Sequence, residues 1–237
     1  MKMDMRKFLV LLALGISAAS ADSFASCGYD GEVFATGQAR DPKSGRLVYC
    51  EYHLPAKGAQ RRVLYYSPAG HRIAEKQLSE VNSTIPGVAQ QDYRHGEQRI
   101  VDPGSGRVEL RYRENASSDW DVAQLSTAEV EVADAGFDTF VRRNWNALSA
   151  GQTVTFGFAS PVHGRAIPLR ARQVACDGGS GKLCLRVDLD QAFLRMFVSN
   201  LYLEYDRDSR RLLLFDGVTN LLDPQGGSQR LRIDYSY

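Results

Sequence analysis

The 237-residue chain has a formal net charge of only +1, and it lacks long apolar runs and histidines at metal-binding spacing. Residues 1–21 have the form of a secretory signal, with basic residues up to Lys7, an apolar run over 8–16 and small residues at 19–21. The remaining 216 residues carry 26 basic and 27 acidic side chains, a net charge of −1. Nucleic-acid-binding proteins carry a clustered basic surplus, so that class is excluded.

The apolar runs are too short to cross a membrane. Residues 8–16 fall far below the roughly 20 apolar residues of a transmembrane helix, and no later run is longer. We therefore expect a soluble or peripherally held protein of the bacterial periplasm. A lipoprotein is the alternative, because residues 24–26 before Cys27 loosely resemble the motif that precedes a lipid-modified cysteine.

Four cysteines in an exported chain predict disulfides, with three possible pairings. Cys176 and Cys184 lie symmetrically about Ser180 in a turn-rich stretch between two alternating segments, which predicts a hairpin closed by a disulfide. In this register Arg172 faces Asp188 as an opposite-charge pair. The other contacts that it predicts are Ala171 with Leu189 and Ala175 with Leu185, and a core-facing row of Leu185, Val187 and Leu189.

Elimination then pairs Cys27 with Cys50, although lipidation of Cys27 would leave Cys50 free. Both bonds are interpreted as structural, because no C-x-x-C motif suggests redox chemistry.

The first half of the chain indicates a β-meander. Over residues 29–113, alternating apolar and polar segments are separated by turn sequences at 41–45, 67–70 and 102–106. Residues 115–126 are polar and irregular, which favours a connecting loop.

The clearest helix is predicted at about residues 136–150. Asp134 or Asp138 can cap its N-terminal end, and Gly151 suits its C-terminal end. Its apolar stripe comprises Phe137, Phe140, Val141, Trp145 and Leu148. A second, shorter helix is predicted from Asp190 to about Ser199.

Residues 212–215 are four consecutive large apolar residues, which indicates a strand covered on both faces. Without repeats or linkers, residues 22–237 are expected to form a single domain. The predicted fold is mainly β (α+β): an antiparallel meander forming a curved sheet or half-barrel wrapped on the central helix, with the second short helix.

Candidate chemistry is sparse. His53, His71, His95 and His163 lie in separate segments, and neither they nor the glycine-rich stretch at 178–182 fit a metal, phosphate or nucleophile motif. We therefore predict no catalytic residues, no metal and no cofactor. An enzyme would require His163 or His95 within hydrogen-bond reach of a serine and a carboxylate.

The 23 aromatic residues lie mostly on predicted strands, where they pack in the core or line an apolar ligand site. The residues proposed to line such a site are Phe140, Trp145, Phe156, Phe158, Leu203, Leu213 and Phe215.

Three segments carry a resemblance. Residues 136–145 with the strand at 154–158, then 203–213 and 216–221, resemble an exported proteobacterial protein family of unknown function. The meander and central helix are also distantly similar to the half-barrel fold of periplasmic lipoprotein carriers, which implies a hydrophobic ligand.

We therefore hypothesise a non-enzymatic periplasmic protein that binds a lipid or another apolar small molecule. The alternative is an envelope structural or interaction module without a ligand pocket, whose protein partner the sequence does not identify.

Overall fold

The computed structural model describes residues 26–177, 179, 181–190 and 200–237, in which fifteen strands form one open sheet. The first eight are β1 (Ala35–Arg40), β2 (Leu47–His53), β3 (Arg61–Tyr66), β4 (Arg72–Ser79), β5 (Gly87–Asp92), β6 (Gln98–Pro103), β7 (Arg107–Arg113) and β8 (Asp121–Ser126). The others are β9 (Val132–Ala133), β10 (Val154–Ser160), β11 (Arg165–Val174), β12 (Lys182–Leu189), β13 (Leu201–Asp206), β14 (Leu212–Val218) and β15 (Arg230–Ser236). The helices are α1 (Gly136–Arg143), α2 (Trp145–Ser149) and the 3₁₀ turn η1 (Pro161–His163).

Two meanders make up the sheet. Strands β1 to β8 follow one another outward to one edge, and β15 to β9 follow one another backward to the other edge. The first and last strands join the meanders, with Gly37 opposite Tyr235 and Ala39 opposite Ile233. Every pairing is antiparallel except β9 with β10. The predicted β-rich class and the turns of the first meander are confirmed.

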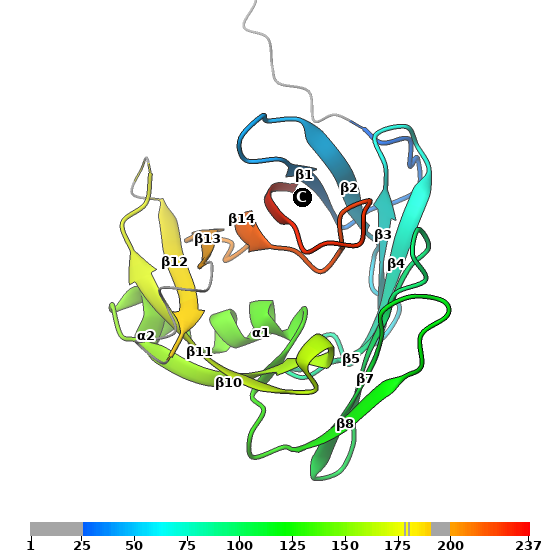
Figure 1. The fold of residues 1–237 in the computed structure, drawn as a ribbon. Coiled ribbons are helices and arrows are strands. Elements are labelled where there is room, and N and C mark those ends of the chain that lie inside the picture. The colour runs from blue at the N-terminus through cyan, green and yellow to red at the C-terminus, as the bar shows by residue number, and fades with distance from the viewer. Residues whose placement is uncertain (1–25, 178, 180, 191–199) are drawn as a thin grey trace, which may run out of the picture.

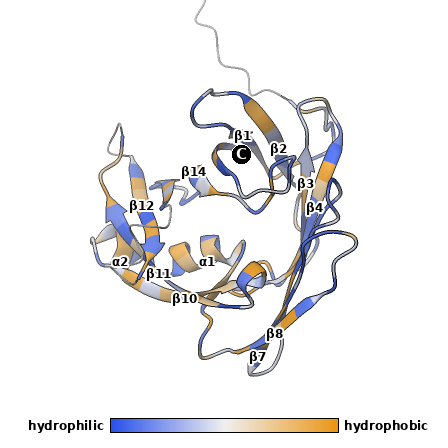
Figure 2. Ribbon diagram, in the orientation of Figure 1, coloured by the Kyte–Doolittle hydropathy of each residue, from blue (hydrophilic) through white to orange (hydrophobic). Residues whose placement is uncertain are grey.

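The sheet curves strongly, and α1 lies within its curve (Figure 1). Phe140 and Val141 of α1 and Trp145 of α2 form a buried apolar cluster with residues of β10, β12 and β13. β12 contains both hydrophobic and hydrophilic residues (Figure 2), and they alternate over 185–189, so one face of the strand is available to this core. Leu183, Leu185 and Val187 are its contribution.

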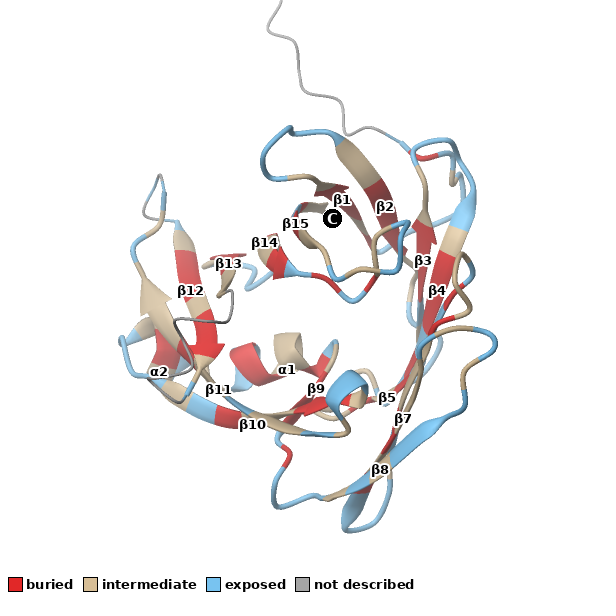
Figure 3. Cartoon of the chain, in the orientation of Figure 1, coloured by how far each residue is buried: buried red, intermediate tan, exposed pale blue. Residues whose placement is uncertain are grey.

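The two ends of the sheet meet by packing. Leu78, Val88, Val101 and Leu110 lie opposite one another across β4 to β7, and they pack with Ala159 of β10 in a second buried cluster. Figure 3 shows buried residues along β3 and β4 and an exposed β8 at the free edge. Side-chain contacts therefore hold together ends that no strand pairing joins.

Asp134 fastens the start of α1 to two other elements. Its carboxylate accepts hydrogen bonds from Lys76 Nζ of β4 at 2.7 and 2.9 Å and from Asn220 Nδ2 after β14 at 2.9 Å. The side chain of Lys76 is 5% exposed and that of Asp134 is 16% exposed, so the ion pair is largely buried. Asp134 has φ 43°, a left-handed conformation that aspartate adopts more readily than most residues.

The prediction of one continuous helix at 136–150 is wrong, because two shorter helices occupy this range. The range is divided into α1 and α2 at Asn144, whose backbone departs from helical geometry with φ −97° and ψ 13°. Ala135 occupies the N-cap position without a side-chain hydrogen bond, so neither Asp134 nor Asp138 is the N-cap. Gly151 follows α2 with φ 79°. The predicted helix from Asp190 to Ser199 lies, apart from Asp190, outside the described residues.

One strand prediction needs correction, and the apolar run at 212–215 has an additional cause. Residues 121–126 of the predicted loop form β8, which pairs with β7 as an edge strand. In the second case, Tyr205 is opposite Leu212 while Glu204 is opposite Leu214, so Leu213 is the extra residue of a β-bulge. The bulge explains the loss of alternation over 212–215, because an extra residue reverses the order of the two faces.

The Cys176–Cys184 disulfide is present, but the predicted register is wrong by two residues. Asp188 faces Arg170, with Nε to Oδ1 at 2.6 Å, while Arg172 faces Arg186. Cys184 pairs with Val174, because β11 ends two residues before Cys176. An even shift leaves each side chain on its face, so the core-facing positions of Leu185 and Val187 are confirmed.

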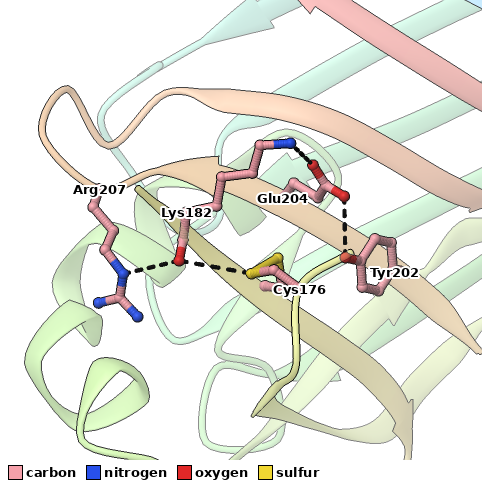
Figure 4. The surroundings of a disulfide bond; sticks show 6 residues. Cys176, Lys182, Tyr202, Glu204 and Arg207 are labelled. Atoms are coloured by element: carbon pink, nitrogen blue, oxygen red, sulfur yellow. Dashed lines mark hydrogen bonds and ion pairs between the residues drawn. A yellow bond between two sulfur atoms is a disulfide. The ribbon is translucent and has the colours of Figure 1, made fainter. Parts of the chain in front are cut away.

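Hydrogen bonds connect the β11–β12 hairpin near its tip to the β13–β14 hairpin. The carbonyl oxygen of Lys182 accepts a hydrogen bond from Arg207 Nε at 2.8 Å (Figure 4). Lys182 Nζ donates to Glu204, which also accepts from the Tyr202 hydroxyl.

The Cys27–Cys50 disulfide is also present. It packs with Tyr52 and Leu64 in a small buried cluster, and the Tyr52 hydroxyl accepts a hydrogen bond from the Cys27 backbone nitrogen. The bond occupies the sulfur that the lipoprotein alternative would modify.

We expect Lys76→Ala to lower the free energy of unfolding by about 3–5 kcal/mol, because Asp134 would remain buried without its charged partner. Urea denaturation monitored by circular dichroism measures the loss. Lys43→Ala, at an exposed turn position, is the matched control and should change the stability by less than about 0.5 kcal/mol. Equal stabilities for the two variants would contradict a structural role for the Lys76–Asp134 pair.

Candidate functional site

A cavity of about 450 Å³ lies between α1 and the concave face of the sheet. Its volume falls within the roughly 300–1,000 Å³ of small-molecule sites. The apolar lining comes from both meanders and includes Val63, Leu78, Val187, Leu203, Phe215 and Ile233. The core is therefore incompletely filled where the two meanders and α1 meet.

The alternation of side chains along β13 and β14 gives the cavity part of its apolar wall. Leu201, Leu203 and Tyr205 alternate along β13, so they share the face that lines the cavity. On β14, Phe215 lies opposite Leu203, and Leu212 lies opposite Tyr205 across the bulge. These two strands thus form a continuous part of the wall.

Three of the seven residues proposed from the sequence to line a ligand site do so: Phe158, Leu203 and Phe215. Phe140, Trp145 and Phe156 instead fill the core behind α1 and α2, where the rings of Phe140 and Phe156 lie 4.6 Å apart. Leu213 is the bulge residue and does not line the cavity. Burial in the protein core takes the three aromatic side chains away from the site.

The lining also contains polar side chains that were not predicted to lie there. Tyr49, Glu51 and His53 are spaced two residues apart on β2, as are Lys76 and Leu78 on β4, so each set shares one strand face. This two-residue spacing from inward-facing apolar residues is the sequence signal that could have revealed Glu51 and Lys76.

Glu51 is held by two partners inside the cavity. It is 6% exposed, and its Oε2 lies 3.1 Å from His53 Nε2 and 3.0 Å from the Tyr235 hydroxyl. Tyr235 reaches Glu51 across β1 at Gly37, where an added Cβ would lie 2.9 Å from the tyrosine ring. Burial raises the pKa of Tyr235 well above its ordinary value, so the neutral phenol donates to Glu51.

One end of the cavity carries charged and exposed residues, and we call it the mouth: Phe34, Arg61, Asp138, Arg142 and Tyr237. Arg142 Nη2 lies 2.8 Å from Asp138 Oδ2 in an ion pair between successive turns of α1. The Arg61 guanidinium lies 4.5 Å from the Phe34 ring centre, and the Phe34 and Tyr237 rings meet edge to face.

Asp138 is partly exposed, although protein surrounds it. Its side chain is 40% exposed, yet burial raises the pKa of this carboxyl above its ordinary value, against the opposing effects of Arg142 and Arg61. Both observations agree if the exposed surface faces the cavity, where surrounding protein limits hydration. The electrostatic effect is smaller than in a sealed site because water has access.

The histidines do not form a catalytic arrangement in the part of the chain that the structure describes. Ser160 Oγ lies 2.8 Å from His163 Nδ1, but there His163 has no carboxylate partner, and it is exposed. His95 Nε2 is 2.9 Å from the Asp223 carbonyl. Among the described residues, no cluster of three or more His, Cys, Asp or Glu side chains could hold a metal.

The chain matches no protein family model, no curated protein and no solved structure.

We expect Asp138→Asn to alter the pH dependence of stability. Because the folded state raises this pKa, it binds the proton more tightly than the unfolded chain, and ionisation costs stability as pH rises from 3.8 through the folded-state pKa. The unfolding free energy of the variant should therefore increase relative to that of the unmodified protein across that window. Urea titrations at a series of pH values measure the difference.

Asp206→Asn is the control of opposite sign, because hydrogen bonds from Ser209 lower the pKa of Asp206. Below pH 3.8, the relative stability of this variant should fall as pH rises. A pH-independent difference for Asp138→Asn would contradict the environment described for Asp138.

Proposed function

We propose that this protein binds a lipid or another apolar ligand in the cavity, without catalysing a reaction, in the bacterial periplasm. The observation that carries the proposal is the cavity of about 450 Å³, to which both meanders contribute apolar walls. Burying an acyl chain there is favourable because it removes roughly 25 cal/mol of unfavourable hydration for each Å² of apolar surface.

The arrangement of α1 supports the same proposal. In this proposal, the curved sheet is a half-barrel and α1 is the central helix that it surrounds. This is the fold that the sequence resemblance to periplasmic lipoprotein carriers implies. Asp138, Thr139 and Arg142 of α1 line the cavity, while Phe140 and Val141 are anchored in the core. The helix thus presents one side to the ligand and the other to the protein.

An exported location fits the covalent structure. Both disulfides are typical of proteins that fold in an oxidising compartment. None of the helices among the described residues has the length and apolar character needed to span a membrane. We propose the periplasm as the site of action.

An envelope interaction module is the second candidate. β8 pairs only with β7, and its Val122 is 57% exposed beside the 38% exposed Trp120. An unpaired strand edge with exposed apolar residues can accept a strand from another protein.

Native mass spectrometry of protein purified from the periplasm separates the two candidates. A co-purifying species with the mass of a lipid supports the ligand-binding function. A bare chain, or a chain bound only to another protein, would contradict it and favour the interaction module.

We expect Thr139→Trp to lower the affinity for the neutral apolar probe 1-N-phenylnaphthylamine by about tenfold or more, because the indole occupies cavity volume. Asn146→Trp, at an exposed position of α2, is the matched control and should retain the affinity. Probe fluorescence measures binding, and thermal unfolding establishes that both variants fold. Undiminished binding by folded Thr139→Trp protein would place the probe outside the cavity.

A further inference from the structure

The residues of the mouth are exposed, whereas the apolar wall of the site is buried. Phe34 is 39% exposed and Tyr237 is 44% exposed, and the side chains of Asp138 and Arg142 are 40% and 43% exposed. In contrast, Val63, Leu203 and Ile233 of the apolar wall are at most 3% exposed. A ligand that fills the cavity would therefore place its polar end among the residues of the mouth.

Arg61 is held in the mouth by stacking on Phe34. Its Nε atom is buried and lacks a hydrogen-bond partner among the described residues, and no ion pair joins its guanidinium to them. Stacking leaves the hydrogen-bonding edge of a guanidinium free, because the contact uses only its face. The Nη atoms of Arg61, which also form no hydrogen bond with the described residues, are therefore the donors available to a ligand in the cavity.

The mouth also carries an excess of positive charge. Asp138 is paired with Arg142, whereas Arg61 and Arg211 are stacked on the aromatic rings of Phe34 and Tyr237. Tyr237 adds no negative charge at neutral pH, since burial raises its pKa to about 12. The mouth therefore holds two guanidinium groups, those of Arg61 and Arg142, with the single carboxylate of Asp138, and Arg211 lies next to it on the Tyr237 ring.

We infer that the mouth binds the anionic head group of an amphiphile whose apolar chain occupies the cavity, and that Arg61 donates hydrogen bonds to that head group. This inference rests on the proposed ligand-binding function and specifies its ligand class. Arginine binds carboxylate and phosphate oxygens through two parallel hydrogen bonds, so both head groups share the required chemistry. Arg142 contributes charge while it keeps its ion pair with Asp138.

A cationic head group is disfavoured in the same site. It would have to lie beside Arg61 and Arg211, and like charges at short distance repel strongly where water is partly excluded. The single carboxylate that could attract it, Asp138, is already paired with Arg142.

The experiment compares ligands of one chain length by isothermal titration calorimetry at pH 8 with delipidated protein. Dodecanoate should bind about tenfold more tightly than dodecanol, since a charge-assisted hydrogen bond contributes that much. In Arg61→Gln, dodecanoate should lose about tenfold in affinity while dodecanol binds as before. Dodecyl phosphate should follow dodecanoate, whereas acetate, which lacks the chain, should not compete.

Arg113→Gln is the matched control, because Arg113 is likewise stacked on an aromatic ring, that of Trp120, but does not line the cavity. It should bind dodecanoate, dodecanol and dodecyl phosphate as the unmodified protein does. Thermal unfolding of both variants establishes that they fold.

The outcomes separate the two proposals. Equal affinities for dodecanoate and dodecanol, or a loss of both in folded Arg61→Gln protein, would overturn the head-group site while leaving the apolar ligand site in place. Competition by acetate at the concentrations of dodecanoate would reduce the mouth to a simple anion site. Failure of every chain-bearing ligand to bind the unmodified protein would contradict the proposed function itself.

Discussion

A fifteen-stranded sheet with two free edges holds its curve only if contacts other than strand pairing connect its ends. Here those contacts are the apolar packing of β4 to β7 against β10 and the buried pair of Lys76 with Asp134. The pair is costly to desolvate, but Asn220 and the Ala135 backbone nitrogen also bind the carboxylate and satisfy it. The volume enclosed by the sheet, and the position of α1 within it, depend on this connection.

The cavity combines apolar walls with polar groups whose hydrogen bonds are satisfied to different degrees. Glu51 is bound by His53 and Tyr235, so it contributes to a fixed internal network. Arg61 is held in place by an aromatic ring and keeps its donors unused. Such a difference separates groups that support the fold from groups that are available to a ligand, because unsatisfied buried donors are otherwise selected against.

Local pattern predicted much of the fold. Alternation and turn residues located most strands of both meanders, and hairpin geometry identified the Cys176–Cys184 bond. The register failed because the sequence does not show where β11 ends, and the continuous helix failed because the backbone leaves helical geometry at Asn144. Three of the seven proposed lining residues were correct. Periodicity gives the face of a strand, but only the packing of α1 decides which inward residues, such as Phe156 and Phe158, meet protein or the cavity.

The pairing of β1 with β15 has a consequence for biosynthesis. Residues 35–40 lack one of their two neighbours until residues 230–236 have been synthesised, because β15 follows the other fourteen strands in sequence. The sheet is completed only by this contact of very long sequence separation, which slows folding relative to hairpin formation. The N-terminal meander therefore keeps one open edge during synthesis of the remainder, and truncation before β15 would leave two sheets in place of one.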